Sequence, residues 1–456
     1  MRAGMHLIEK PFSLAAHAET MRFVLATRPS KTLSLRSPAN EWLPNGGTII
    51  TECDRSIGPR PDRPIREMRT NEDAPLAVSR RVGTDMRLVV REAHTSAPGA
   101  ERAIDELHDR LDASGASASL LFCSSRYDLE QLGRKIASTF STPVVACTTA
   151  GQIGQRGYQQ GGITAVSLRS SELRMNPYLI SPLSQCQARA AEVAFSAMSG
   201  LMERGRERAF GLVLTDGMSG AEERLAASLY QSLGAVPLVG GSAGDDLTLQ
   251  GTYVYHDGRF LRDAALLALF ETTLPFTTFK VQHAVPGRRK LVVTEADPEE
   301  RVVLEFNGEP AAEAYAEAIG VGVDELNSLL FSKNPLMLPS DGQHYIRSVK
   351  GVRPDNSLAF FCSLEEGLVL TVGENINPLL ALQRSFDGVE RKIGKPEIVL
   401  GCDCVLRRLE FEHDGSAAAV GEFMAKQRVV GFSTYGEQYD AIYVNQTLSA
   451  VALSAG

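Results

Sequence analysis

The chain has 456 residues, of which 43% are hydrophobic and 22% charged, a composition typical of a globular protein with two or three domains. A net charge of −8 argues against nucleic-acid binding as the main activity, and the longest apolar runs, such as 264–270, are too short to span a bilayer. Seven scattered cysteines are typical of reduced thiols, so we expect a cytoplasmic protein without disulfides or membrane spans.

Residues 1–85 differ from the rest of the chain. Arginines are scattered over 55–81 among prolines, and no apolar period persists. Such a stretch buries too little surface to offset its ordering entropy, so we expect a disordered extension. A basic interaction arm is the alternative, and translation could also start at Met86, ahead of a strand-like run at 87–91.

Residues 86–271 are expected to form an N-terminal domain of repeated strand-helix-strand units. An amphipathic helix is predicted over 100–111. Each unit ends in a short apolar strand and a turn rich in glycine and hydroxyls, first at 142–151 and again at 236–244. The second unit contains Ser219-Gly-Ala-Glu222, which has the pattern of a capping box. Such turns allow a ligand or another backbone to approach closely.

Residues 272–456 are predicted to form a strand-rich, mixed C-terminal domain. Short apolar runs follow one another, with an expected break at Pro286-Gly287, and Asn377-Pro378 has the pattern of a helix start. A third copy of the turn lies at 429–437, and a pair of strands closes the chain over 441–453. The fold class is therefore α/β to α+β, and three equivalent turns indicate internal duplication.

The polar residues at these turns suggest recognition of a small ligand rather than bond breaking. Gly240–Gly244 lacks the lysine of a phosphate-binding loop, and Asp245 follows it, so an ammonium group would suit the site better than a phosphate. Asp245 could instead cap a turn. The predicted ligand-binding residues are Thr148, Thr149, Ser242, Asp245, Arg347, Thr434, Glu437 and Asn445, with Asp245, Arg347, Thr434, Glu437 and Asn445 in one pocket shared by both domains.

Neither catalysis nor metal binding is expected. Cys402-Asp-Cys404 has no second ligand pair nearby. An enzyme that uses Cys147, Thr148 or Thr434 as nucleophile is an alternative, although no activating base is placed beside them in sequence.

Two histidines at strand ends raise a different possibility. His283 follows a predicted strand and precedes Ala-Val-Pro, and His344 precedes Tyr345-Ile346. Such a residue could ligate a haem iron, although a lone histidine is more often a hydrogen-bonded structural residue.

Several motifs in this order resemble the FIST family. They are Val145–Gly151, Leu238–Asp245, the block from Val293 to Ala311, and Gly431–Glu437 with Asn445–Thr447. The resemblance covers about 90–453 and implies a FIST N and a FIST C domain in a bacterial sensor of small ligands such as amino acids. Some stand-alone members bind haem, sense nitric oxide and regulate a separate histidine kinase. It is on this basis that His283 is the favoured haem ligand, with His344 as the fallback.

Overall fold

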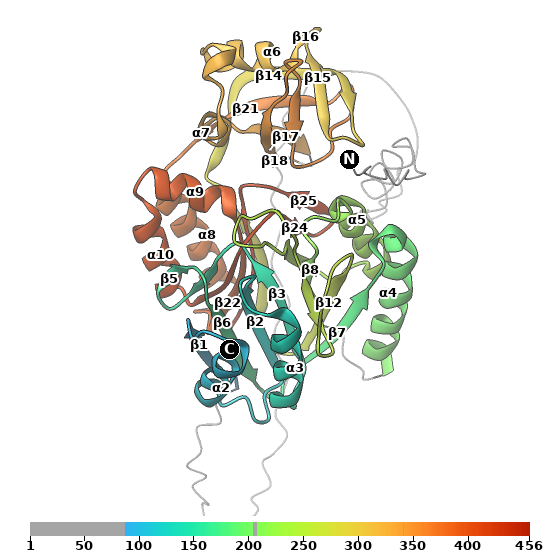
Figure 1. Cartoon of the computed structure of the whole chain (residues 1–456), viewed down its shortest axis with the longest axis vertical. Helices are drawn as coiled ribbons and strands as arrows, with labels where there is room; N and C mark the ends of the chain where they lie inside the picture. Colours follow the sequence, from blue (N-terminus) through green and yellow to red (C-terminus); the bar gives the residue numbers. More distant parts are fainter. Residues whose placement is uncertain (1–86, 204–207, 341) are drawn as a thin grey trace, which may run out of the picture. The chain divides into compact units, whose positions relative to one another are not determined.

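The computed structural model describes residues 87–203, 208–340 and 342–456 (Figure 1). The prediction of a disordered extension over 1–85 lies outside the described residues. No helix among the described residues is long and apolar enough to cross a bilayer. The expected α/β to α+β class is confirmed, because three mixed sheets with helices are joined by one antiparallel sheet.

The described chain contains three copies of one folding unit, here called repeats one, two and three. Repeat one comprises β1 (Val89–Thr95), α2 (Ala100–Leu111), β2 (Ala118–Ser124), α3 (Leu129–Thr139), β3 (Val144–Thr149), β4 (Gln152–Gly154), β5 (Gly157–Gln159) and β6 (Ile163–Arg169). Repeat two comprises β7 (Leu173–Ile180), η1 (Leu183–Gln185), α4 (Cys186–Glu203), β8 (Ala209–Thr215), α5 (Glu222–Leu233), β9 (Leu238–Ser242), β10 (Val254–His256), β11 (Arg259–Leu261) and β12 (Ala265–Thr272). Repeat three comprises β13 (Phe276–Val281), α8 (Pro378–Ile393), β22 (Ile398–Cys404), α9 (Val405–His413), α10 (Ala417–Lys426), β23 (Val429–Thr434), β24 (Glu437–Tyr439), β25 (Ile442–Val444) and β26 (Leu448–Leu453). The predicted duplication is therefore confirmed.

Each repeat contributes a hairpin to another repeat. The strand orders are β1-β6-β2-β3-β10-β11, β7-β12-β8-β9-β24-β25 and β13-β26-β22-β23-β4-β5. Hairpin β4–β5 of repeat one pairs with β23 of repeat three, β10–β11 of repeat two pairs with β3, and β24–β25 of repeat three pairs with β9. The chain then returns to its own sheet through β6, β12 or β26. This cyclic exchange ties the three repeats together.

A long segment is inserted into repeat three between β13 and α8. Its elements are β14 (Ala284–Asp297), β15 (Val302–Phe306), β16 (Glu309–Pro310), α6 (Ala311–Ile319), η2 (Val323–Glu325), α7 (Ser328–Lys333), β17 (Leu336–Ser340), β18 (Gln343–Arg347), β19 (Val349–Val352), β20 (Leu358–Phe360) and β21 (Val369–Asn375). The strands form one antiparallel sheet, drawn in yellow to orange in Figure 1. Phe306, Tyr315 and Phe331 lie in its own hydrophobic core.

The three mixed sheets share a central core. Leu120, Phe210 and Leu400, one from each repeat, belong to the same buried cluster, and Phe122 stacks on Phe432 with ring centroids 5.0 Å apart. The opposite face of each sheet is covered by the helices of its own repeat. Strands that are buried on both faces read as continuous apolar runs, as the sequences of β2, β8 and β22 do.

Local predictions held in most places and failed in three. The helix over 100–111 and the Asn377 cap with Pro378 at the first position of α8 are confirmed. The capping box at Ser219 is wrong, because α5 begins after Ala221 without a side-chain cap. Strand β14 runs through Pro286-Gly287: Pro286 pairs with Gly373 of β21, and a register shift follows between Pro286 and Lys290. Finally, β25 and β26 belong to different sheets rather than forming a pair.

Candidate functional site

The three glycine-rich turns meet one another and form a ring of backbone hydrogen bonds, here called the turn ring. Ala150 N donates to Ser433 O at 3.0 Å, Tyr435 N to Ser242 O at 3.2 Å, and Gly244 N to Thr148 O at 3.0 Å. A Cβ on Gly244 would lie 2.5 Å from Ala150 N. The space that the small residues of each turn leave open is therefore occupied by the backbone of another turn.

The predicted ligand residues of the turns are buried in this ring. Thr148, Thr149, Ser242 and Thr434 are at most 2% exposed. The carboxylate of Asp245 accepts hydrogen bonds from Leu249 N, Gln250 N and Gly251 N, and from the hydroxyls of Thr248 and Tyr435. Burial raises the pKa of Asp245, but these hydrogen bonds outweigh it and the net pKa lies below its usual value. Asp245 thus acts as the cap of the turn over 248–251.

Hydrogen bonds connect part of the remaining predicted set. Arg347 Nη1 donates to Tyr443 O at 2.8 Å, and Tyr443 Oη donates to Tyr435 O at 3.1 Å. Glu437 is fully buried and accepts from Thr434 Oγ1, Thr447 N and Thr447 Oγ1. Asn445 is 1% exposed, and its Oδ1 has no hydrogen-bond partner.

The eight predicted residues therefore surround the turn ring and the β24–β25 hairpin, but neither of the two pockets described next is lined by any of them. Whether any of them contacts a ligand stays a prediction.

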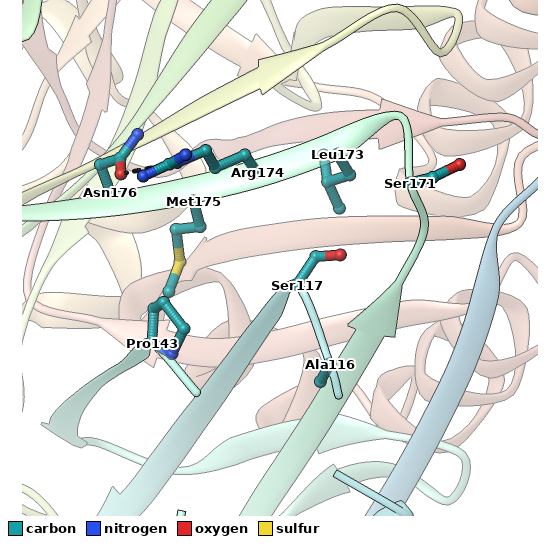
Figure 2. Close-up of a pocket in the computed structure, with 8 residues that line it drawn as sticks. All are labelled: Ala116, Ser117, Pro143, Ser171, Leu173, Arg174, Met175 and Asn176. Atoms are coloured by element: carbon teal, nitrogen blue, oxygen red, sulfur yellow. Dashed lines mark hydrogen bonds between the residues drawn. The ribbon is translucent and has the colours of Figure 1, made fainter. Parts of the chain in front are cut away.

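The first pocket, of about 410 Å³, lies beside the amino ends of β2 and β3 (Figure 2). Ser117 and Pro143 precede these strands, and Arg174 and Asn176 of β7 lie opposite. The Arg174 Nε donates to Asn176 Oδ1 at 3.2 Å, so the charged group of this pocket already has a partner. Ligands of α/β sheets usually bind at the carboxyl ends of strands, which makes this pocket the weaker candidate.

The second pocket, of about 480 Å³, lies between the insertion and the helices of repeat three, and we call it the Glu410 pocket. Its size falls in the range of small-molecule sites. Helix α9, which starts where β22 ends, supplies Glu410 and Phe411. The other lining residues are Lys333, Asn334, Glu374, Asn375, Ile376, Pro378, Asp414 and Ser416.

Glu410 holds the inner end of this pocket and is 6% exposed. Its Oε1 accepts from Asn375 Nδ2 at 2.7 Å and contacts His283 Nε2 at 3.0 Å, while Oε2 accepts from the hydroxyl of Ser332 at 2.5 Å. Burial raises the pKa of Glu410, but these hydrogen bonds outweigh it, so the net pKa lies below its usual value. The carboxyl group is therefore ionised at neutral pH.

Behind Glu410 lies a line of buried polar residues, here called the buried chain: Glu410, His283, Arg407, Asp403 and Tyr158. Arg407 Nη1 lies 3.0 Å from His283 Nδ1, and its Nε donates to Asp403 Oδ1 at 2.8 Å. Tyr158 Oη donates to the other oxygen of Asp403 at 2.7 Å. His283, Arg407 and Asp403 are at most 1% exposed.

The buried chain determines the tautomer of His283. A guanidinium can only donate, so Nδ1 of the ring accepts from Arg407 and the proton resides on Nε2, facing Glu410. Burial lowers the pKa of His283, and the charge of Arg407 lowers it further, against the raising effect of Glu410. His283 is therefore neutral at pH 7.

These contacts do not fit the haem that the resemblance implies. An axial ligand needs an unshared ring nitrogen, but Nδ1 of His283 accepts from Arg407 and Nε2 faces Glu410. His344 is half-exposed on β18 at the end of its sheet, and neither histidine lines the two pockets. The described residues also contain no group of three or more His, Cys, Asp or Glu placed to hold a metal ion.

The proposed nucleophiles of the alternative enzyme are equally enclosed. Burial raises the pKa of Cys147 well above its usual value, which keeps the thiol protonated and unreactive. Thr148 and Thr434 have no measurable exposure. The surroundings of these residues are those of core side chains.

The sequence interpretation missed the residues that build the Glu410 pocket. Arg407 and Glu410 follow Asp403 at intervals of four and three residues, which places all three near one another once a helix begins at Val405. In this unit, helical spacing is clear in the sequence only at Val420, Phe423 and Met424, which lie in α10. Asn375, Ser332 and Tyr158 come from distant elements and give no local signal.

The chain matches two protein-family models. A family model described as FIST N domain matches residues 117–309, and one described as FIST C domain matches 311–440. No curated protein matches the chain. The predicted boundary between the two domains, at 271, stays a prediction. Because the two models together match well over half of the sequence, the chain belongs to the FIST family of signal-transduction sensor proteins.

Proposed function

We propose that this protein senses an α-amino acid, or a closely related metabolite with an ammonium group, and binds it in the Glu410 pocket. The observation that carries the proposal is the ionised, largely buried carboxylate at the inner end of the pocket. A carboxylate offers about four acceptor positions. Three are engaged by His283, Asn375 and Ser332, which leaves one on Oε2 for a ligand.

Two further acceptors suit an ammonium group with its three donors. The Nδ2 of Asn375 donates to Glu410 and to Ser332 O, while the buried Oδ1 of the same amide has no partner. Glu374 also lines the pocket and is exposed. Together with Glu410, these groups can accept all three N–H donors of a primary ammonium.

The pocket also contains groups that can bind the negatively charged carboxylate of an amino acid. Lys333 lines the pocket and forms an exposed ion pair with Asp414 at 3.1 Å. Ser416 precedes α10, and the first turn of that helix has no side-chain cap. Free N–H groups at a helix start favour a carboxylate, so the ligand's carboxylate is expected between Lys333 and Ser416.

The test is a thermal-shift and calorimetric screen of the purified chain with the common amino acids and simple amines. A ligand present at about 100 times its dissociation constant should stabilise the protein by roughly 2.7 kcal/mol. Glu410→Gln should weaken binding by at least about tenfold, because one charge-assisted bond is lost. Arg174→Gln, in the pocket of Figure 2, is the matched control and should bind normally. Absence of binding by every compound would contradict the proposal.

Haem binding through His283 and nitric oxide sensing are the weaker proposal, since both ring nitrogens already have partners. A Soret band in protein purified from haem-supplied cells, lost in His283→Ala, would support it against the amino-acid proposal. Regulation of a separate histidine kinase is a proposal that rests on the family resemblance, and co-purification of a kinase with the full chain would test it.

A further inference from the structure

We propose that the buried chain couples the Glu410 pocket to hairpin β4–β5, so that a change of charge at Glu410 alters the attachment of this hairpin to repeat three. The inference rests on the proposed function only in assigning the ligand to this pocket. The coupling itself concerns residues of the chain and can be tested without a ligand.

The hairpin is an element of repeat one held in the sheet of repeat three. Strand β4 pairs with β23 through only two residue pairs, Gly431 with Ile153 and Phe432 with Gln152. Against helix α10 the hairpin packs closely, since a Cβ on Gly157 would lie 2.8 Å from Gly421 Cα. Just before β4, two more backbone hydrogen bonds join Ser433 to the same segment, from Ser433 N to Gly151 O and from Ala150 N to Ser433 O. Tyr158 Oη adds a side-chain hydrogen bond from β5 to Asp403 of β22, and this is the attachment that the buried chain reaches.

The links between Tyr158 and the pocket involve charged groups in the protein interior. Asp403 and Arg407 have no measurable exposure, and neither solvent nor salt screens their interaction. Polar groups in such surroundings polarise one another, and removing one partner leaves the next unsatisfied. A change at Glu410 therefore alters the hydrogen bonding of His283, then that of Arg407, and then that of the Asp403 carboxylate, which accepts from Tyr158.

Arg407 has the freedom that such coupling needs. Its Nη2 is buried and has no hydrogen-bond partner, although Nε and Nη1 are both engaged. An ammonium group bound at Oε2 of Glu410 neutralises the carboxylate and weakens its contact with His283 at Oε1. A shift of the His283 ring changes the position of Arg407, which can exchange the partners of its three nitrogens without leaving Asp403. The bistable element is thus the guanidinium between Asp403 and His283.

Hydrogen–deuterium exchange of the full, ligand-free chain tests the coupling. Glu410→Gln removes the charge at the pocket, and Tyr158→Phe removes the bond at the hairpin. Each should raise the exchange of amides in 152–160 by about tenfold, because local opening becomes easier. The matched controls are Asp414→Asn, which removes an exposed carboxylate of the same pocket, and Tyr127→Phe, which removes the hydroxyl that donates to Ala97 O in repeat one. Both should change exchange in 152–160 by less than about twofold.

The double variant Glu410→Gln/Tyr158→Phe tests whether Glu410 and Tyr158 are energetically coupled. Residues without shared partners usually give additive effects, so the two changes should be non-additive only if the buried chain couples them. We expect Tyr158→Phe to add less than about twofold in the Glu410→Gln background. Additive effects, or normal exchange in Glu410→Gln, would overturn the inference. If Glu410→Gln does not fold, Glu410→Asp replaces it, since the shorter side chain breaks the contact with His283 while keeping the charge.

The outcomes separate this inference from the proposed function. Additive exchange effects together with amino-acid binding in the screen would leave the pocket assigned and the coupling rejected. Non-additive effects without any binding compound would support the coupling and contradict the ligand class.

Discussion

Arg407 donates from Nη1 to Nδ1 of His283 over 3.0 Å, and both side chains are almost completely buried. This contact keeps the imidazole neutral and directs its remaining proton towards Glu410. It also occupies the nitrogen that a metal would need. The relationship between these two residues therefore favours a structural and transmitting role for His283 over iron ligation.

His283→Ala is expected to destabilise the protein by roughly 2–4 kcal/mol, because it leaves Arg407 and Glu410 with unsatisfied buried groups. Burial holds the pKa of His283 below 6.5, so wild-type protein should lose stability as the pH falls below that value, where the unfolded chain takes up the proton. Urea unfolding at pH 5 and pH 7 should show a smaller difference for the variant than for wild type. His344→Ala, at a half-exposed position, is the control and should cost less than about 0.5 kcal/mol.

Glu437→Gln should change the pH dependence of stability in the opposite sense. Burial raises the pKa of Glu437 from 4.5 to about 8, so the folded state keeps the carboxyl group protonated where the unfolded state ionises it. Stability from this group is complete below pH 4.5 and is lost as the pH rises towards 8. The variant should remove up to about 4 kcal/mol of this loss between pH 5 and pH 8. An equal loss in wild type and variant would show that Glu437 does not titrate in this range.

Gly244→Ala should disrupt the turn ring. The new Cβ would lie 2.5 Å from Ala150 N, a backbone atom that also donates to Ser433 O. We expect a destabilisation of roughly 2–3 kcal/mol, measured by thermal unfolding. Gly351→Ala is the matched control, because nothing lies within 4 Å of its Cβ position, and it should change stability by less than about 0.5 kcal/mol. A similar melting temperature for both variants would mean that the ring is not tightly packed.

Cys147 should resist alkylation in the folded protein. Its thiol is completely buried and its pKa is raised well above the usual value, so almost no thiolate is available. Peptide mapping after iodoacetamide treatment should find Cys147 labelled in urea and unlabelled under native conditions. Rapid native labelling would instead revive the interpretation of this residue as a nucleophile.

The sequence by itself determined the local elements and the repeat. Buried strands such as β8 and β22 appear as continuous apolar runs, and the helix over 100–111 appears as an amphipathic period, because both patterns reflect burial of one local segment. The three turns could be aligned because each needs small residues within one short stretch, where another backbone approaches closely. The family followed from motifs that lie within single stretches of chain.

Only the tertiary structure decided which of these strands, helices and turns contact one another. The exchange of hairpins pairs β4 with β23 across almost 280 residues of sequence, and it turns the three predicted ligand turns into contacts among themselves. The Glu410 pocket joins α7, β21, α8 and α9, and its buried chain reaches Tyr158 of repeat one. No local period or spacing predicts these contacts, because they depend on apolar packing and hydrogen bonds between residues that are far apart in the sequence.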